Sequence, residues 1–299
     1  MKHQMKQRRR IAVAGTTMAA AAVMLALAPL NMGGCSAGSV GDAVGSAVGG
    51  TTGQLIGAGG KAVEAAAMNE TQEEAMGQSV AVAITNRYGL DADESLNRYV
   101  TLVGMTVASG SPRADATFNF GVLNTDQVNA YAGPNGYIMI TRGALKQMQD
   151  ESELAGVLAH EIAHVVDRHG LNKMKQAGFT QAAMQAAKTN GDVAQWAHAT
   201  DNIVQGIVDG QYNQDQESRA DLLAVDYLVA SGYDPNGYHA FLRRTASAQA
   251  SNSSLMSSHP NMGNRAARVA TKIQQKGATG GAKLPERFKK NVPGAKPAA

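Results

Sequence analysis

The chain has 299 residues, of which 44% are hydrophobic, and a formal net charge of +3. This length accommodates one large domain or two small ones. Residues 1–34 hold five cations and no acid, so the remaining 22 basic and 24 acidic residues leave the rest of the chain close to neutral. No basic stripe is left that would indicate a nucleic-acid partner. The single cysteine, Cys35, excludes an intramolecular disulfide.

The first 34 residues have the pattern of an export signal. A basic stretch, 2–10, precedes an apolar run, 11–30, and small residues then lead to Cys35. This end resembles the lipobox of bacterial lipoproteins, and Ser36 favours the outer membrane. We therefore predict a lipoprotein-type signal peptide over 1–34 and lipidation of Cys35. The alternatives are an ordinary signal peptide with an incidental thiol, or a membrane anchor.

Residues 35–69 are poor in charge and rich in Gly and Ala. Glycines recur at every fourth position from Gly41 to Gly57. On a helix this spacing would create a small-residue face suited to helix packing in lipid. Because glycine is a weak helix former in water, we predict a flexible tether, with a helix-packing segment as the alternative.

The sequence of residues 70–141 predicts two helices and a small sheet. Apolar periodicities indicate amphipathic helices over 70–88 and 91–109. Three short β patterns follow at 117–123, 127–132 and 136–141. The Gly-Pro-Asn-Gly sequence between the last two is typical of a hairpin turn. The sheet therefore comes directly before the helix described next.

A buried helix with an H-E-x-x-H motif is the most informative feature of the chain. Asp150 and Glu153 have the spacing of an N-cap and its capping-box partner. His160 and His164 share one helix face, so their imidazoles can bind one cation, and Glu161 can reach a water on that cation. Zinc-assisted peptide hydrolysis requires this set. The alternative is a pair of core histidines with a chance glutamate.

The sequence predicts that this helix ends at residues 167–170, with Gly170 just after its C-terminus. We assign a structural role to His169. Further helices are predicted at 177–187, 194–208, 216–231, 235–241 and 264–276, with a Ser-rich loop at 248–258. The tail, 277–299, has the composition of a disordered segment. We therefore predict an α+β fold that is mainly helical, with its catalytic domain over 70–276. No repeat with a tetratricopeptide period is present.

A catalytic zinc site needs three protein ligands and one water. A third histidine six residues after His164 is excluded, because Gly170 stands there, and no carboxylate lies within 170–190. Glu217 and Asp221 are four residues apart on a predicted helix. The first could bind zinc, and the second could accept the Nδ1–H of a ligating histidine. A solvated charged face is the alternative for this pair.

Several ordered motifs make the chain similar to a known family. The H-E-x-x-H motif is followed by Glu217-Ser218-Arg219-Ala220-Asp221, and further matches are N-A-Y-A at 129–132, G-Y-I-M-I-T-R-G at 136–143, D-R-H-G at 167–170, and S-H-P at 258–260 with Arg265. Over residues 70–275 the chain thus resembles the gluzincin metallopeptidases of the HtpX and CAAX-prenyl-protease type. Without hydrophobic spans after residue 35 and without tetratricopeptide repeats, it is most similar to their periplasmic outer-membrane lipoprotein members.

This resemblance implies a zincin-like metallopeptidase domain that binds one Zn²⁺ per chain. His160, His164 and Glu217 would be the zinc ligands. Glu161 would be the catalytic base, and Asp221 would orient a ligating histidine.

The resemblance also implies roles for residues around the metal. His259 is a candidate catalytic donor to the oxyanion, or a ligand that caps the zinc and holds the enzyme idle. Arg265 is expected to bind a substrate carbonyl or to pair with an acid near the site. Asn129, Ala130 and Tyr131 are expected to bind an extended substrate, which adds to an edge strand by backbone pairing.

We therefore expect a zinc endopeptidase of the bacterial cell envelope that hydrolyses unfolded or misassembled envelope proteins. It would act in the periplasm, anchored to the outer membrane through lipidated Cys35. The main alternative is a plugged zinc-binding chaperone or assembly factor for outer-membrane proteins, against which the intact Glu161 argues. A structural lipoprotein and a hydrolase of peptidoglycan peptides are the remaining alternatives.

Overall fold

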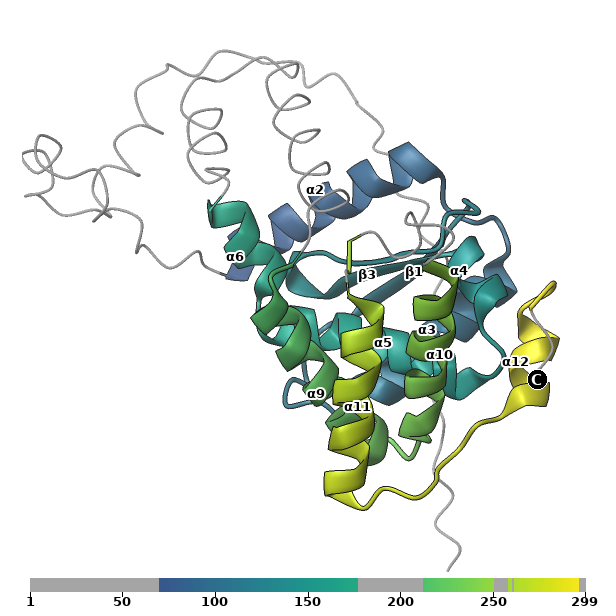
Figure 1. The fold of residues 1–299 in the computed structure, drawn as a ribbon. Coiled ribbons are helices and arrows are strands. Elements are labelled where there is room, and N and C mark those ends of the chain that lie inside the picture. Colours follow the sequence, from purple (N-terminus) through teal and green to yellow (C-terminus); the bar gives the residue numbers. More distant parts are fainter. Residues whose placement is uncertain (1–69, 177–211, 250–257, 260, 296–299) are drawn as a thin grey trace, which may run out of the picture. The chain divides into compact units, whose positions relative to one another are not determined.

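The computed structural model describes residues 70–176, 212–249, 258–259 and 261–295, all within one unit, Ala67–Ala299 (Figure 1). The expected signal peptide, the lipidation site, the tether, the two helices expected between positions 177 and 208, and most of the Ser-rich loop lie outside the described residues. Within those ranges, no helix has both the length and the apolar character that crossing a membrane requires.

The described part of the chain is mainly helical and contains one three-stranded sheet. Its elements are α2 (Glu70–Tyr88), α3 (Glu94–Ala108), β1 (Asn119–Leu123), β2 (Ala130–Ala132), the short 3-10 helix η3 (Pro134–Gly136), β3 (Tyr137–Thr141), α4 (Arg142–Gln147), α5 (Glu151–Val166), α6 (His169–Gln176), α9 (Gln214–Ala230), α10 (Pro235–Gln249), α11 (Met262–Lys276) and α12 (Pro285–Asn291). This order confirms the expected α+β fold with a small sheet before the H-E-x-x-H helix. Helices α4, α6 and α12 are not predicted from the sequence, and α10 extends past Phe241.

The sheet has the strand order β1-β3-β2, with β1 parallel and β2 antiparallel to β3. The connection between β2 and β3 has left-handed backbone at Asn135 (φ 52°) and Gly136 (φ 83°). These conformations confirm the expected hairpin turn. Strand β2 lies at an edge of the sheet, which is the position that the addition of an extended peptide requires.

Successive side chains of the sheet enter two different cores, because side chains alternate between the faces of a strand. Ile138 and Ile140 of β3 join the main core with residues of α3 and α5. Met139 and Tyr131 instead pack with Val80 of α2. The sheet therefore lies between α2 and α5 (Figure 1).

Helix α5 is buried over almost its whole length and is surrounded by α3, α9 and α10. Its N-cap is Asp150, as predicted, and the Asp150 carboxylate accepts the Glu153 N–H at 3.1 Å. The reciprocal bond of a capping box is absent. Glu153 instead accepts the Gln149 N–H at 3.0 Å and an Arg244 N–H at 2.9 Å.

The C-terminal end of α5 differs from the prediction. The C-cap is Asp167, the left-handed residue is Arg168 (φ 53°), and Gly170 lies inside α6. The prediction that Gly170 ends the helix was therefore wrong. The chain turns two residues earlier because His169 packs back against His164, with their Nδ1 atoms 2.9 Å apart.

Two glycines allow α5 and α10 to approach closely. A Cβ added to Gly156 would lie 2.4 Å from Cβ of Tyr238, and one added to Gly237 would lie 1.9 Å from Oγ of Ser152. No side chain fits at such distances. The two glycines therefore let α10 pack closely against α5. This contact brings Tyr238 to the polar site described below.

The segment after α11 also differs from the expected disorder, because it contains α12. Phe288 is fully buried and lies 6.5 Å from the ring of Tyr99. Arg287 donates to Glu151 of α5 at 2.5 Å, and the Lys283 carbonyl accepts the Glu151 N–H at 2.9 Å. The segment thus closes the first turn of α5, whose N–H groups lack partners within the helix.

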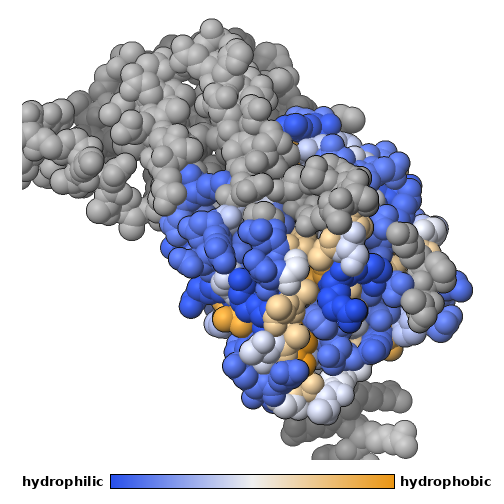
Figure 2. Space-filling model, viewed as in Figure 1, coloured by the Kyte–Doolittle hydropathy of each residue, from blue (hydrophilic) through white to orange (hydrophobic). Residues whose placement is uncertain are grey.

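Helix α11 is amphipathic, and its buried residues include Val269 and Ile273. Figure 2 shows that the outer face around α9, α10 and α11 is mostly hydrophilic, with a narrow apolar band near α10 and α11. Burial of the apolar face fixes α11 against α9 and α10. Arg265, on the same face, is therefore directed towards α5 and α9.

Candidate metal centre and active site

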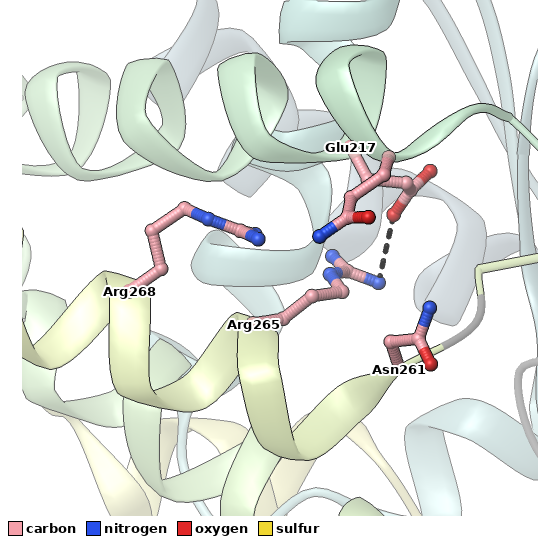
Figure 3. A pocket seen from close by; sticks show the side chains of 5 residues that line it. Glu217, Asn261, Arg265 and Arg268 are labelled. Carbon is pink, nitrogen blue, oxygen red and sulfur yellow. Dashed lines mark ion pairs between the residues drawn. The ribbon is translucent and has the colours of Figure 1, made fainter.

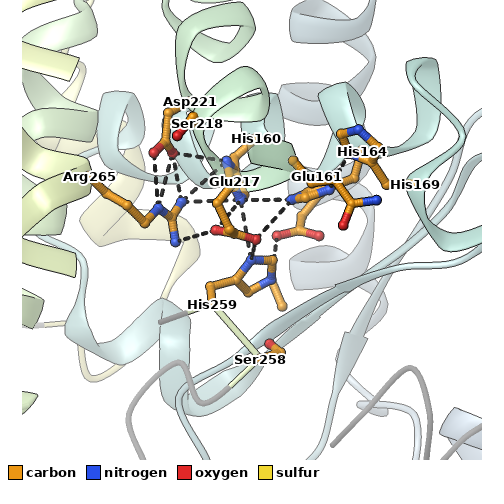
Figure 4. Close-up of polar contacts among 12 residues, drawn as sticks. His160, Glu161, His164, His169, Glu217, Ser218, Asp221, Ser258, His259 and Arg265 are labelled. Atoms are coloured by element: carbon orange, nitrogen blue, oxygen red, sulfur yellow. Dashed lines mark hydrogen bonds and ion pairs between the residues drawn. The ribbon is translucent and has the colours of Figure 1, made fainter. Parts of the chain in front are cut away.

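Four buried side chains from three parts of the chain point towards one another (Figure 4). His160 and His164 lie one turn apart on α5, Glu217 lies in the first turn of α9, and His259 precedes α11. Each is at most 3% exposed. One nitrogen or oxygen of each residue lies within 4.8 Å of the others.

The spacing of these donor atoms fits a tetrahedral cation. Nε2 of His160 lies 3.0 Å from Nε2 of His164 and 3.3 Å from Nδ1 of His259. Oε1 of Glu217 lies 2.9 Å from Nδ1 of His259 and 3.4 Å from Nε2 of His164. Zinc bonds of about 2.1 Å at tetrahedral angles separate donors by roughly 3.4 Å. Imidazole nitrogens and a carboxylate are also the donors that zinc prefers, so the residues fit the metal.

Asp221 is placed to orient His160. Its Oδ1 lies 3.2 Å from Nδ1 of His160 and accepts the Tyr238 hydroxyl at 2.8 Å. Burial opposes ionisation of Asp221, but Arg265 and His160 outweigh it and hold the pKa of this carboxyl well below its usual range. Burial and Arg265 oppose protonation of His160, yet Glu217 and Asp221 raise its pKa to about 9. A cation at Nε2 therefore displaces a proton.

Arg265 pairs with the two carboxylates that α9 brings to the site. Its side chain is 2% exposed, and its Nη1 lies 3.1 Å from Oε2 of Glu217. Its Nη2 donates to Oδ1 of Asp221 at 2.8 Å and to the Tyr238 hydroxyl at 2.7 Å. Of the two roles expected for Arg265, this geometry supports pairing with acids near the site. The guanidinium ties both carboxylates of α9 to α11.

Glu161 differs from the other acids of the site in its hydrogen bonding. It is 0% exposed, and neither carboxylate oxygen has a hydrogen-bond partner among the described residues. Nε2 of His259 lies 3.4 Å from its Oε1. A buried carboxylate without partners is costly. Such a group indicates a functional position, because a base must keep a lone pair available.

The protonation states of Glu217 and His164, two further ligand candidates, favour the binding of a cation. Burial opposes ionisation of Glu217, but His259 and Arg265 outweigh it and hold its pKa well below the usual range. Burial lowers the pKa of His164 well below its usual range. At neutral pH the site therefore offers a carboxylate and a neutral imidazole, which are the metal-binding forms of these groups.

Sequence reasoning missed three side chains that contact this centre. Tyr238 bonds Asp221, as described above, and the Tyr212 ring stacks on His164 at 4.0 Å and 18°. His169, assigned a structural role from the sequence, contacts Nδ1 of His164. The two tyrosines lie outside any motif, so only the packing of α9 and α10 reveals them. For His169 the signal is its place directly after the H-E-x-x-H helix.

A small hollow lies beside the centre (Figure 3). It is lined by Gln214, Glu217, Asn261, Arg265 and Arg268. Figure 3 shows the Glu217 carboxylate and the Arg265 guanidinium facing each other there. Its charged and amide lining suits water or a polar group better than an apolar side chain.

The edge strand approaches the centre through Asn129. Oδ1 of Asn129 accepts the hydroxyl of Ser258 at 2.7 Å and the Ala130 N–H at 3.0 Å. Ser258 directly precedes His259, so this part of the edge lies near the donor set. The Tyr131 ring instead stacks on Tyr88 at 6.0 Å, on the α2 face of the sheet. The Tyr131 side chain is therefore directed away from the donor set.

Comparisons with known proteins agree with this geometry. Residues 94–273 match Peptidase family M48. Metalloprotease YcaL of Escherichia coli (strain K12) is 28% identical over 225 residues, which are 74% of this chain and 88% of that protein. Metalloprotease LoiP of the same strain is 25% identical over 228 residues, 75% of this chain and 89% of that protein.

A longer relative is the Beta-barrel assembly-enhancing protease of Yersinia pestis, which is 29% identical over 191 residues, or 60% of this chain. This chain spans only 39% of the length of that protein. The match to the family extends from α3 to α11 and contains the whole donor set. The chain therefore belongs to peptidase family M48.

Proposed function

We propose that the protein is an endopeptidase of the bacterial envelope in which His160, His164 and Glu217 bind one zinc ion and Glu161 is the general base. The observation that carries this proposal is the Glu161 carboxylate, which is buried beside the donor set and has no hydrogen-bond partner among the described residues. A general base must lie close to the reacting water and be free to take its proton. The other carboxylates of α5, by contrast, have hydrogen-bond partners.

Bound zinc lowers the pKa of a water ligand towards about 7 and polarises a substrate carbonyl. Glu161 would take the proton of the attacking water and pass it to the leaving amine as the peptide bond breaks. His259, whose Nε2 lies 3.4 Å from Oε1 of Glu161, could donate to the oxyanion that forms on the carbonyl. Asp221 would keep the Nε2 lone pair of His160 directed at the metal.

The edge strand β2 supports extended protein chains as substrates. A peptide that adds to an edge is held by main-chain hydrogen bonds, so recognition depends little on side chains. This mode suits unfolded or misassembled proteins. The relative named a beta-barrel assembly-enhancing protease supports envelope proteins as the substrate class. A signal peptide over 1–34 and a lipid on Cys35 would place the enzyme in the periplasm, at the outer membrane.

Digestion of an unfolded model protein tests the proposal. We expect the purified protein to cut internal peptide bonds, to lose this activity on chelation and to regain it with zinc. Glu161→Gln should be about 10²–10⁴-fold slower, because the base is gone, yet bind the same amount of zinc. Cleavage by this variant at the parental rate would remove Glu161 from the mechanism. No cleavage by the zinc-loaded parent would favour the second candidate.

A plugged form that binds zinc without cleaving, and acts as a chaperone or assembly factor, is the second candidate. The position of His259 favours it. Nδ1 of His259 takes a fourth protein position among the donors, whereas catalytic zinc sites keep one position open for water. The bond from Ser258 to Asn129 holds the neighbouring histidine close to the start of strand β2.

His259→Ala separates the two roles of this histidine. If His259 caps the zinc, the variant should cleave faster than the parent. If His259 donates to the oxyanion, the variant should be about 10²–10³-fold slower. Ser258→Ala is the matched variant, because it weakens the hold on Asn129 and keeps the imidazole. It should raise the rate only if His259 is a plug.

A further inference from the structure

We propose that His169 is a positioning residue that fixes the tautomer and the orientation of His164, through a relay that starts at Asp167. The inference rests on the proposed role of His164 as a zinc ligand. It concerns the D-R-H-G segment after α5, for which the proposed mechanism has no use. The relay runs from Asp167 through His169 to His164, and Arg219 of α9 pairs with Asp167.

The two ring nitrogens of His164 have different surroundings. Nε2 faces the donor set, 3.0 Å from Nε2 of His160 and 3.4 Å from Oε1 of Glu217. A histidine that binds a metal through Nε2 carries its proton on Nδ1. His164 is 0% exposed, so this N–H cannot rely on bulk solvent for an acceptor. Nδ1 of His169, at 2.9 Å, is the acceptor.

His169 can accept this bond only if its own proton is on Nε2. Nε2 of His169 lies 3.9 Å from Oδ2 of Asp167, which is too long for a hydrogen bond but close enough for the carboxylate charge to favour a proton there. Arg219 donates to Oδ1 of Asp167 at 3.3 Å and holds this carboxylate in place. Each member of the relay therefore favours the tautomer that the next one needs.

The backbone after α5 is shaped for this contact. In a continuous helix a residue five positions after His164 would lie roughly 140° away around the axis. The left-handed conformation of Arg168 (φ 53°) breaks the helix and turns His169 back onto His164. Such a conformation is unfavourable for a residue other than glycine and persists where the surroundings enforce it. Both α5 histidines thus have an acceptor at Nδ1, Asp221 for His160 and His169 for His164.

Zinc affinity of His169 variants tests the relay. His169→Phe keeps a ring of similar size but removes the acceptor, and we expect about 10–100-fold weaker zinc binding in competition with a chromophoric chelator. His169→Asn places an amide oxygen near the former Nδ1 and should stay within about threefold of the parent. Equal affinities for all three proteins would overturn the proposal. Equal losses in both variants would also overturn it, because they would show a packing role.

Two further measurements keep the outcome clear. His164→Ala should lose zinc whether or not the relay exists, so retention of zinc by this variant would refute the ligand assignment and not the relay alone. If His169→Phe does not fold, ¹⁵N–¹H spectra of the zinc-loaded parent decide the question. They should show His164 protonated on Nδ1 and His169 protonated on Nε2. A proton on Nδ1 of His169 would contradict the relay.

Discussion

Helix α5 contacts two clusters of buried acids, one at its N-terminus and one at the metal centre, and the two clusters differ in their hydrogen bonding. In the N-terminal cluster, Glu151 and Glu153, every carboxylate oxygen is bonded. Glu151 accepts the hydroxyls of Tyr99 at 2.8 Å and Tyr233 at 2.6 Å, and also bonds Arg287. Glu153 bonds Arg244 and a backbone N–H. At the metal centre, neither oxygen of Glu161 has a hydrogen bond within the described residues. Oε2 of Glu217, on α9, has no hydrogen bond there either, but it forms an ion pair with Arg265 at 3.1 Å.

Burial and charge alone do not distinguish these clusters, because both consist of buried acids close to cationic or polar side chains. The distinction is whether the acids are satisfied by the protein itself. A satisfied cluster can only stabilise the fold. A cluster left incomplete can take an external partner, which in the proposed mechanism is zinc for the donor set and a proton for Glu161.

The largest effect that we expect from this comparison is a dependence of stability on zinc. Zinc should raise the free energy of unfolding through the acids of the metal centre and not through Glu151 and Glu153. At free zinc near 1,000 times its dissociation constant, removal of the metal should lower the free energy of unfolding by about 4 kcal/mol. Denaturant titrations with and without chelator measure this change. Glu161→Gln, which keeps the ligands, should respond like the parent. A parent that is equally stable with and without zinc would show that the donor set is already satisfied, and would contradict the comparison.

The N-terminal cluster should give a smaller effect that is independent of zinc. Glu151→Met keeps the length of the side chain but leaves two buried tyrosine hydroxyls without their acceptor, so we expect a loss of about 3 kcal/mol. Denaturant titrations should give the same loss with and without chelator. Zinc stoichiometry should not change. A loss that disappears on chelation would mean that the two ends of α5 are coupled.

How much of this could be predicted from the sequence depends on whether the signals are local. The position of α5, its N-cap Asp150 and the spacing of His160, Glu161 and His164 all lie within one helix, and helical periodicity makes them readable. The pairing with Glu217 required a second motif and the family resemblance. By contrast, the end of α5 was misjudged, because the turn at Arg168 depends on a side-chain contact that no propensity encodes.

The C-terminal segment shows the same limit more clearly. Its composition is polar and rich in Gly, Pro and Lys, which predicts disorder. Its structure depends on a few long-range contacts, namely the burial of Phe288 against Tyr99 and the bonds of Arg287 and Lys283 with Glu151. The sequence did not predict the places of Tyr238 and Tyr212 at the metal centre, for the same reason. Isolated residues that act through tertiary packing leave no local pattern.

The smallest expected effect concerns the pH dependence of the bond between α12 and α5. Burial opposes ionisation of Glu151, but hydrogen bonds from Arg287, Tyr233 and Tyr99 outweigh it and lower its pKa. A lowered pKa in the folded state stabilises the protein above the unfolded value, about 4.3, and this stability is lost as the pH falls through the folded value. Arg287→Met should therefore cost about 1 kcal/mol above pH 5, a value reduced by the exposure of Arg287.

The difference between Arg287→Met and the parent should shrink as the pH falls through the lowered folded pKa of Glu151, because Glu151 then becomes protonated in both proteins. Lys289→Met is the matched control, since it removes an exposed cation from the same helix and should leave the pH profile unchanged. Urea titrations from pH 3 to 7 would measure both variants. A loss that is the same at every pH would mean that Arg287 acts by packing, so that the charge on Glu151 is satisfied by its tyrosines alone.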